Sequence, residues 1–188
     1  MRYNKYILFI LLSLLLLSAC STALNDYDEV NKPFDISRYF TGEIVGWGMV
    51  QDYNGKVSRR FCVEIEGTWQ GNKGVLAETF YFKDGEVSYR NWQLTKDIDG
   101  SYAGVAEDVA GTAMGAHQGF AFQFNYDLLL AYKGDTYEVA MDDWMYQMDE
   151  YRVMNKTSLS KLGVVMADIT LFFDKEKPLK TCASFKKI

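Results

Sequence analysis

The chain has 188 residues, of which 24% are charged, a formal net charge of −5 and a single histidine. This length fits one domain. The acidic balance argues against binding to a nucleic-acid backbone, which requires clustered Lys and Arg, and one histidine excludes zinc sites built on three imidazoles. We therefore predict no metal, no cofactor and no nucleic-acid partner.

The first residues predict an export signal that ends at a lipid attachment site. Arg2 and Lys5 precede an apolar run over residues 7–17, which is too short to cross a bilayer core because that requires about 20 residues. The run leads into small residues and Cys20, in the pattern of a bacterial lipobox. A basic start, a short apolar run and small residues are typical of a secretory signal peptide. We expect residues 1–19 to be removed and Cys20 to carry acyl chains.

Acylation at Cys20 predicts a protein that is anchored to a membrane but does not span it, because several acyl chains give stable anchoring. Ser21 follows the cysteine; in Gram-negative bacteria, an aspartate there usually retains a lipoprotein in the inner membrane. Its absence favours an outer-membrane lipoprotein of the bacterial envelope that faces the periplasm. Residues 20–37 are predicted to form the lipidated N-terminus and a tether.

After the tether, the sequence alternates between extended runs and tight turns. Over residues 61–66 and 120–126, apolar and polar side chains alternate, which is the period of half-buried strands. Asn-Gly and Asp-Gly pairs separate several of the runs and supply the positive φ values of hairpin turns. The predicted strands cover residues 39–51, 57–69, 74–83, 86–96, 101–109, 112–117, 119–131, 136–147, 150–156 and 164–173.

These elements predict an all-β fold, an antiparallel, up-and-down, lipocalin-like β-barrel of about eight to ten strands over residues 38–175. Long strands joined by hairpins leave sheet edges that closure removes, whereas sandwiches have shorter strands and longer crossovers. Residues 158–163 are interpreted as one helical turn capped by Ser158. Residues 176–188 are interpreted as a mobile, Lys-rich C-terminal tail.

Two further cysteines, Cys62 and Cys182, follow the lipobox cysteine. An exported protein enters an oxidising compartment, where a disulfide between them is allowed. The alternative is two unrelated thiols, one on a strand and one in the tail. The sequence leaves both alternatives open.

The aromatic strands predict a ligand site inside the barrel. A barrel of this size holds its own side chains or one small ligand, and an apolar cavity with few polar groups suits a fatty acyl chain or another lipid. The alternative is an interior that the same side chains fill completely. The residues predicted to contact the ligand are Phe120, Phe122, Phe124, Tyr126, Tyr137, Met141, Arg152 and Asn155.

Charged residues on the strands offer partners for a polar head group. Arginine binds carboxylates and phosphates through a planar fork, and the alternative for each arginine is a surface ion pair. The candidates are Arg59, Arg60, Arg90 and Arg152.

Adjacent carboxylates suggest a second kind of site. Asp142 and Asp143 lie next to each other on a predicted strand and point to opposite faces, unless a β-bulge shifts the phase before Trp144. One of them is then a candidate acid/base or metal-binding partner for Asp168 or Glu78; the alternative is a solvated aspartate. The single histidine, His117, is interpreted as exposed.

Several motifs in register resemble a known family, the domain of unknown function 3833 family of bacterial lipoproteins. The resemblance covers about residues 38–175. It implies no established activity, and the association of this family with lipid-modification genes points to lipids. The motifs that carry the resemblance are Gly46-Trp47-Gly48-Met49, Phe61-Cys62-Val63-Glu64-Ile65-Glu66-Gly67-Thr68-Trp69, Asp142-Asp143-Trp144-Met145-Tyr146, Met154-Asn155-Lys156-Thr157 and Asp168-Ile169-Thr170-Leu171-Phe172-Phe173.

The sequence therefore favours a non-catalytic envelope lipoprotein that binds a lipid or another hydrophobic ligand in a β-barrel. One alternative is a structural or interaction module with a solid core. The other is an enzyme that acts on modified lipids through Asp carboxylates.

Overall fold

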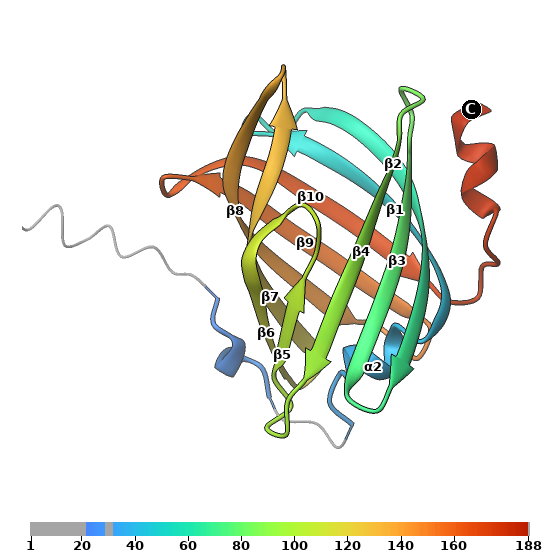
Figure 1. Ribbon diagram of the computed structural model, residues 1–188, viewed down its shortest axis with the longest axis vertical. Coiled ribbons are helices and arrows are strands. Elements are labelled where there is room, and N and C mark those ends of the chain that lie inside the picture. Colours follow the sequence, from blue (N-terminus) through green and yellow to red (C-terminus); the bar gives the residue numbers. More distant parts are fainter. Residues whose placement is uncertain (1–21, 29–31, 188) are drawn as a thin grey trace, which may run out of the picture.

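The computed structural model of the protein describes residues 22–28 and 32–187. The predicted signal peptide and the predicted acylation site at Cys20 lie outside the described residues. Within them, ten antiparallel strands form one closed barrel, and β1 pairs with β10 to close it (Figure 1). The predicted all-β, antiparallel, up-and-down barrel is confirmed, with the strands in sequence order around it. The strands are β1 (Gly42–Asp52), β2 (Val57–Gln70), β3 (Lys73–Phe82), β4 (Val87–Lys96), β5 (Tyr102–Val105), β6 (Val109–Gln118), β7 (Ala121–Tyr132), β8 (Asp135–Gln147), β9 (Arg152–Lys161) and β10 (Val164–Asp174).

Short helices complete the described part of the chain. They are η1 (Leu24–Asp26) before the barrel, α2 (Ile36–Tyr39) beneath one end of it, and η2 (Thr181–Lys187) outside its wall (Figure 1). Among the described residues, no helix combines the length and apolar character required to cross a membrane.

The turns follow the predicted punctuation with one correction. Gly55, Gly85 and Gly100 adopt positive φ at hairpin turns, as the Asn-Gly and Asp-Gly pairs predict. The predicted helical turn at residues 158–163 is wrong, because β9 continues to Lys161 and the hairpin turns at Leu162 and Gly163.

One end of the barrel is closed by α2 and the residues around it. Phe34 and Phe40 are fully buried beneath the barrel core. Asp35 caps α2 by accepting a hydrogen bond from the Ser37 amide at 3.0 Å, and it also binds Lys96 Nζ at 2.6 Å and the Tyr102 hydroxyl at 2.5 Å. We call α2 and the residues around it the plug, and the contacts of Asp35 with Lys96 and Tyr102 the clasp. The clasp connects the plug to β4 and β5, so the folded part of the chain includes residues before 38, where the barrel domain was predicted to start.

A glycine makes room for the plug on β2. The Phe40 carbonyl oxygen approaches Gly67 so closely that a Cβ there would lie 1.9 Å from it. Trp69, two residues further along β2, donates from Nε1 to the same carbonyl at 3.0 Å. Gly67 and Trp69 of the Gly-Thr-Trp motif therefore position Phe40 at the closed end of the barrel.

The shortest of the described strands is β5, which has four residues. On this side, β4 pairs with β5 only from Gln93 to Lys96. The β5–β6 connection bridges the rest. The Asp108 and Glu107 side chains bind Arg90 and Asn91, and the backbone carbonyl of Asp108 accepts a hydrogen bond from the Leu129 amide at 2.7 Å. Polar contacts thus replace strand pairing between β4 and β7.

The C-terminal segment is attached to the outside of the barrel. Cys182 forms a disulfide with Cys62 on β2, and the pair packs with Val45, Leu179 and Phe185. The prediction of a mobile tail is therefore wrong for η2, because a covalent bond and apolar contacts hold it against β1–β3.

The N-terminal segment also packs on the outer wall. Tyr27 contacts Phe120, Trp144 and Tyr146, with ring centroids 5.3–5.9 Å apart. This aromatic cluster covers Trp144, which explains how a tryptophan on the outer face of β8 is buried.

Candidate functional site

The barrel interior changes from solid to partly open along its axis. Near α2, the inward side chains of Ile65, Tyr102 and Phe122 are almost completely buried. Toward the opposite end, the inward side chains of Val50, Phe80, Phe82, Tyr126 and Ile169 remain partly exposed. We call these two regions the closed half and the open half. The prediction of a completely filled interior fits only the closed half.

A charged cluster lies between the two halves. Glu78 on β3 pairs directly with Arg90 on β4, so both side chains face inward. The guanidinium of Arg90 donates from Nε and Nη2 to the Asp108 carboxylate at 2.7–3.0 Å. Arg90 also lies 5.7 Å from the ring centroid of Phe80 and 5.9 Å from that of Trp92. The arginine is thus held by an acid and two aromatic rings.

A second polar group faces inward from β8 and β9. The Asp143 carboxylate accepts hydrogen bonds from Asn155 Nδ2 and from Thr157 Oγ1, the latter at 3.1 Å, and both end on the same oxygen, Oδ1. Asn155 also donates to the Trp144 carbonyl at 3.0 Å. Asn155 and Thr157 therefore fix the orientation of the buried carboxyl group.

Burial controls the ionisation of both interior acids. Loss of solvation raises the pKa of Glu78 to about 7, although Arg90 opposes the shift. Burial likewise raises the pKa of Asp143 to about 6, against the hydrogen bonds from Asn155 and Thr157. Carboxyl groups with raised pKa values in a concave interior are typical of functional sites.

Apolar side chains form the wall of the open half beside this cluster. Leu128, Val139, Met141 and Leu159 form a separate buried group. Tyr126, Ala167 and Ile169 pack against it and remain partly exposed. The arrangement combines an apolar wall with a few convergent polar groups, as ligand sites generally do.

Five of the eight predicted ligand residues lie inside the barrel. Phe122 and Phe124 belong to the closed half, whereas Tyr126, Met141 and Asn155 lie at or near the charged cluster. Their ligand contacts stay a prediction.

The other three predicted ligand residues lie elsewhere. Phe120 lies in the turn between β6 and β7 and packs outside against Tyr27. Arg152 points outward and binds Asp149 and Glu176. Tyr137 faces the mouth of the open half but is 37% exposed, with Lys161 Nζ 5.1 Å from its ring. The interior placement predicted for Phe120 is wrong, because this residue lies in a turn. Arg152 forms the surface ion pairs that were the alternative for each arginine.

The aspartates separate as their alternation predicts, without a bulge. The β7–β8 and β8–β9 registers are regular through Asp143, so the predicted β-bulge is wrong. Asp142 points outward to Gln123 at 2.6 Å, and Asp168 binds Ser158 on the outer face at 2.7 Å. Asp143 and Glu78 are therefore the interior acids among the candidates.

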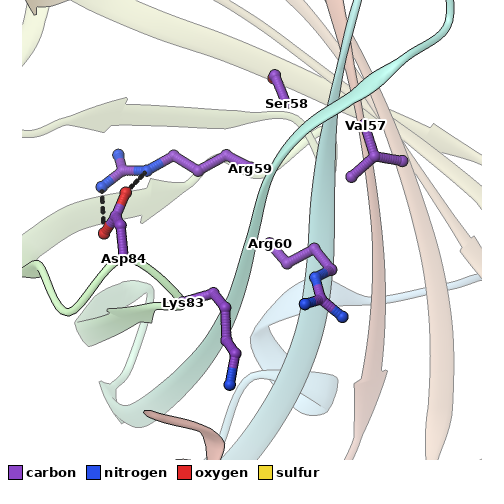
Figure 2. Close-up of a pocket in the computed structure, with 6 residues that line it drawn as sticks. All are labelled: Val57, Ser58, Arg59, Arg60, Lys83 and Asp84. Carbon is purple, nitrogen blue, oxygen red and sulfur yellow. Dashed lines mark hydrogen bonds and ion pairs between the residues drawn. The ribbon is translucent and has the colours of Figure 1, made fainter. Parts of the chain in front are cut away.

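The remaining arginine candidates lie at the rim of the open half. A shallow pocket of about 340 Å³ there is lined by residues of β2 and the β3–β4 turn. Figure 2 shows Arg59 turned toward Asp84, while Arg60 and Lys83 extend away from that pair. Arg59 binds Asp84 and Glu86 at 2.6–3.1 Å and stacks 3.5 Å over the Phe82 ring. The guanidinium of Arg59 is therefore held by residues of the barrel wall.

Two residues that contact the interior charged groups were not predicted from the sequence. Asp108 lies in a turn, and only the short β5 brings it to Arg90. Thr157 belongs to a motif that the sequence singled out, but its hydrogen bond to Asp143 depends on the β8–β9 register.

His117 is half-buried rather than exposed, and its Nδ1 has no hydrogen-bond partner among the described residues. Within those residues, no group of three or more His, Cys, Asp or Glu could hold a metal ion.

The comparison with solved structures finds proteins of low sequence identity. Rv2717c from M. tuberculosis is 14% identical, with a TM-score of 0.52 over 73% of this chain and 93% of that chain. Apocrustacyanin C2 is 16% identical, with a TM-score of 0.38 over 80% and 72% of the two chains. Lobster apocrustacyanin A1 is also 16% identical, with a TM-score of 0.37 over 80% and 71%. At such identities, the likeness to Rv2717c shows the fold alone.

A family match covers the barrel completely. No curated protein matches the chain. The model of the family described as "Protein of unknown function (DUF3833)" matches residues 14–175, a range that includes Cys20, all ten described strands and the charged cluster. The chain therefore belongs to the DUF3833 family.

Proposed function

We propose that this protein is a lipid-anchored envelope protein that binds an elongated hydrophobic ligand in the open half of its barrel. The observation that carries the proposal is the contrast inside the barrel. The inward side chains of the closed half are buried, whereas apolar inward side chains of the open half, such as Phe80 and Ile169, retain contact with solvent. Covering that surface with a ligand contributes about 25 cal/mol per Å² of apolar area.

The anchoring part of the proposal rests on the sequence. The lipobox ends at Cys20, and the family match begins at residue 14, before that cysteine. Cys20 stands two residues before the first described residue, Thr22, and η1 follows at Leu24. An anchor at Cys20 would therefore hold the barrel close to the outer-membrane surface on its periplasmic side.

A cavity-filling variant tests ligand binding. The full chain is held in amphipol and titrated with Nile red, a neutral apolar dye whose emission rises in an apolar site. Ala167 faces inward and packs against the apolar group of the open half, so Ala167→Trp should fill the site and weaken dye binding at least tenfold. Ala131 is exposed on β7, and Ala131→Trp provides the matched control. Equal dye binding by both variants would contradict the proposal.

Metabolic labelling tests the anchor. Cells that express the full chain are grown with an alkyne analogue of palmitate, which is then coupled to a fluorophore. We expect label on the protein and its recovery with outer membranes, and loss of both in Cys20→Ala. Label that persists in Cys20→Ala would show that acylation occurs at another residue, and absence of label from the parent chain would show that the chain is not acylated; either result would contradict the anchor.

A further inference from the structure

The interior acids have hydrogen-bonding capacity that the protein does not use. Glu78 makes no hydrogen bond with any described residue, although Arg90 lies directly opposite. Asp143 uses only Oδ1, and Oδ2 makes no hydrogen bond within the described part of the chain. Among the described residues, the fully buried polar atoms that lack a partner include neither of the Glu78 oxygens nor Asp143 Oδ2, so solvent or a ligand can reach these three atoms. Such groups need a partner from outside the chain.

The hydroxyl group of Tyr126 also has no hydrogen-bond partner within the described part of the chain. Tyr126 pairs with Met141 on β8 and packs edge-on against Trp92, with ring centroids 5.3 Å apart. The hydroxyl lies within electrostatic range of both Glu78 and Asp143. Three acceptor groups therefore converge on the boundary between the closed and open halves.

The net charge of the cluster defines what can bind there. The described groups at this level are three carboxyls, of Glu78, Asp108 and Asp143, and one cation, Arg90. The Nε and Nη2 donors of Arg90 are taken up by Asp108, which also bridges the barrel beside the short strand β5. A ligand carboxylate would add a fourth negative group beside three carboxyls, with only Nη1 of Arg90 left to receive it. A ligand cation would instead relieve the repulsion between Glu78 and Asp143.

We propose that the ligand is an amphiphilic amine whose protonated amino group binds Glu78, Asp143 and Tyr126, while its hydrocarbon chain lies along the apolar wall of the open half. An ammonium group has three donors, which matches the three unused acceptors. The aromatic rings of Trp92 and Phe80 border the cluster and favour a cation over an anion. This inference rests on the proposed function and specifies its ligand class.

The geometry also indicates how the chain of the ligand runs. Leu128, Val139, Met141 and Leu159 continue from the cluster toward the open end, whereas Phe122 and Phe124 fill the space on the other side. The amino group therefore enters first and the chain trails toward the mouth.

Competition among ligands of equal length tests the inference. The full chain in amphipol is loaded with Nile red at pH 8, above the pKa of about 7 for Glu78 and about 6 for Asp143. Dodecylamine, dodecanol and dodecanoate then compete with the dye. We expect dodecylamine to bind at least tenfold more tightly than dodecanoate, with dodecanol between them. Equal competition by all three, or preference for dodecanoate, would overturn the amine assignment while leaving ligand binding intact.

Isosteric variants locate the preference. Glu78→Gln should weaken dodecylamine about tenfold and change dodecanol less than twofold, because only the charge is removed. Glu66→Gln, on the exposed face of β2, should change neither. Failure of Nile red to bind the parent chain would overturn the proposed function and the amine assignment together. An unchanged amine affinity in Glu78→Gln would overturn the assignment alone, and the head-group series in the parent chain does not depend on any variant.

Discussion

The closed and open halves of this barrel are built from the same strands but put their inward side chains to different uses. Phe122 and Tyr102 in the closed half pack edge to face, with ring centroids 5.5 Å apart, and α2 seals them from solvent. In the open half, Phe80 and Ile169 stay partly exposed around unpaired polar groups. Stability and binding are therefore separated along the barrel axis, and changes to each half should have different consequences.

The separation also explains where the fold compensates for a loosely packed interior. The open half gains support from outside its wall, through the Cys62–Cys182 disulfide, and from polar bridges at β5 such as Arg90–Asp108. The disulfide supports the wall from outside, and the Arg90–Asp108 pair supports it at the boundary between the halves.

The largest expected contrast concerns two phenylalanines that both face inward. Phe122→Ala removes a fully buried ring and should lower the free energy of unfolding by about 3–5 kcal/mol. Phe82→Ala removes a partly exposed ring at the open end and should cost only about 1–2 kcal/mol. Urea unfolding followed by tryptophan fluorescence gives both values. Equal losses would erase the distinction between the halves.

The disulfide should affect stability without affecting the ligand site. Cys182→Ala opens a loop with a sequence separation of 120 residues and should reduce the free energy of unfolding by about 2–4 kcal/mol. Since the bond lies outside the wall, Nile red affinity should stay within twofold of the parent. A large loss of affinity would mean that the outer wall shapes the interior.

The interior acids should make the protein less stable as the pH rises. Their pKa values are raised in the folded state to about 7 for Glu78 and about 6 for Asp143, so the folded chain holds protons that the unfolded chain has released. Stability is therefore lost between about pH 4 and 7, by about 1–3 kcal/mol for Glu78. Urea unfolding at pH 5, 6 and 8 measures this loss.

Glu78→Gln isolates the contribution of one acid. This variant should abolish the decline above pH 6 and leave the part due to Asp143 below it. The matched variant Glu66→Gln should keep the full decline. A flat profile in the parent chain would show that neither acid is destabilised by burial.

The smallest expected effect lies at the plug. Burial opposes ionisation of Asp35, but hydrogen bonds from Lys96, Ser37 and Tyr102 outweigh it and hold its pKa well below the usual range. Asp35→Asn should therefore cost about 1 kcal/mol at pH 7, and less below pH 4, where the unfolded aspartate is protonated. Dye binding should not change, because the clasp lies in the closed half; weaker binding would link the two halves.

Local sequence patterns predicted the strands because strand phase and turn chemistry are local properties. The alternation through Phe122, Phe124 and Tyr126 places all three inside the barrel. The same alternation predicted that Phe120 faces inward. However, β7 begins only at Ala121, and the alternation of faces does not apply to a residue in the preceding turn. A one-residue change of phase reverses the face of a side chain.

The site itself depended on contacts between distant segments. Glu78 and Arg90 face each other because of the β3–β4 register, and Asp143 meets Asn155 because of the β8–β9 register. Asp108 joins them through a shortened strand, and the Cys62–Cys182 bond spans most of the chain. No single run of sequence encodes these distances, so the arginine and the acids could be named as candidates but not assembled.

Native mass spectrometry of the protein isolated from its own host tests the central claim most directly. The account predicts a population whose mass exceeds that of the acylated chain by one amphiphile, which fragmentation releases and identifies as an amine. The amphiphile should be missing from Ala167→Trp and retained by Ala131→Trp. An acylated chain without any added mass, which also fails to bind Nile red, would contradict the account.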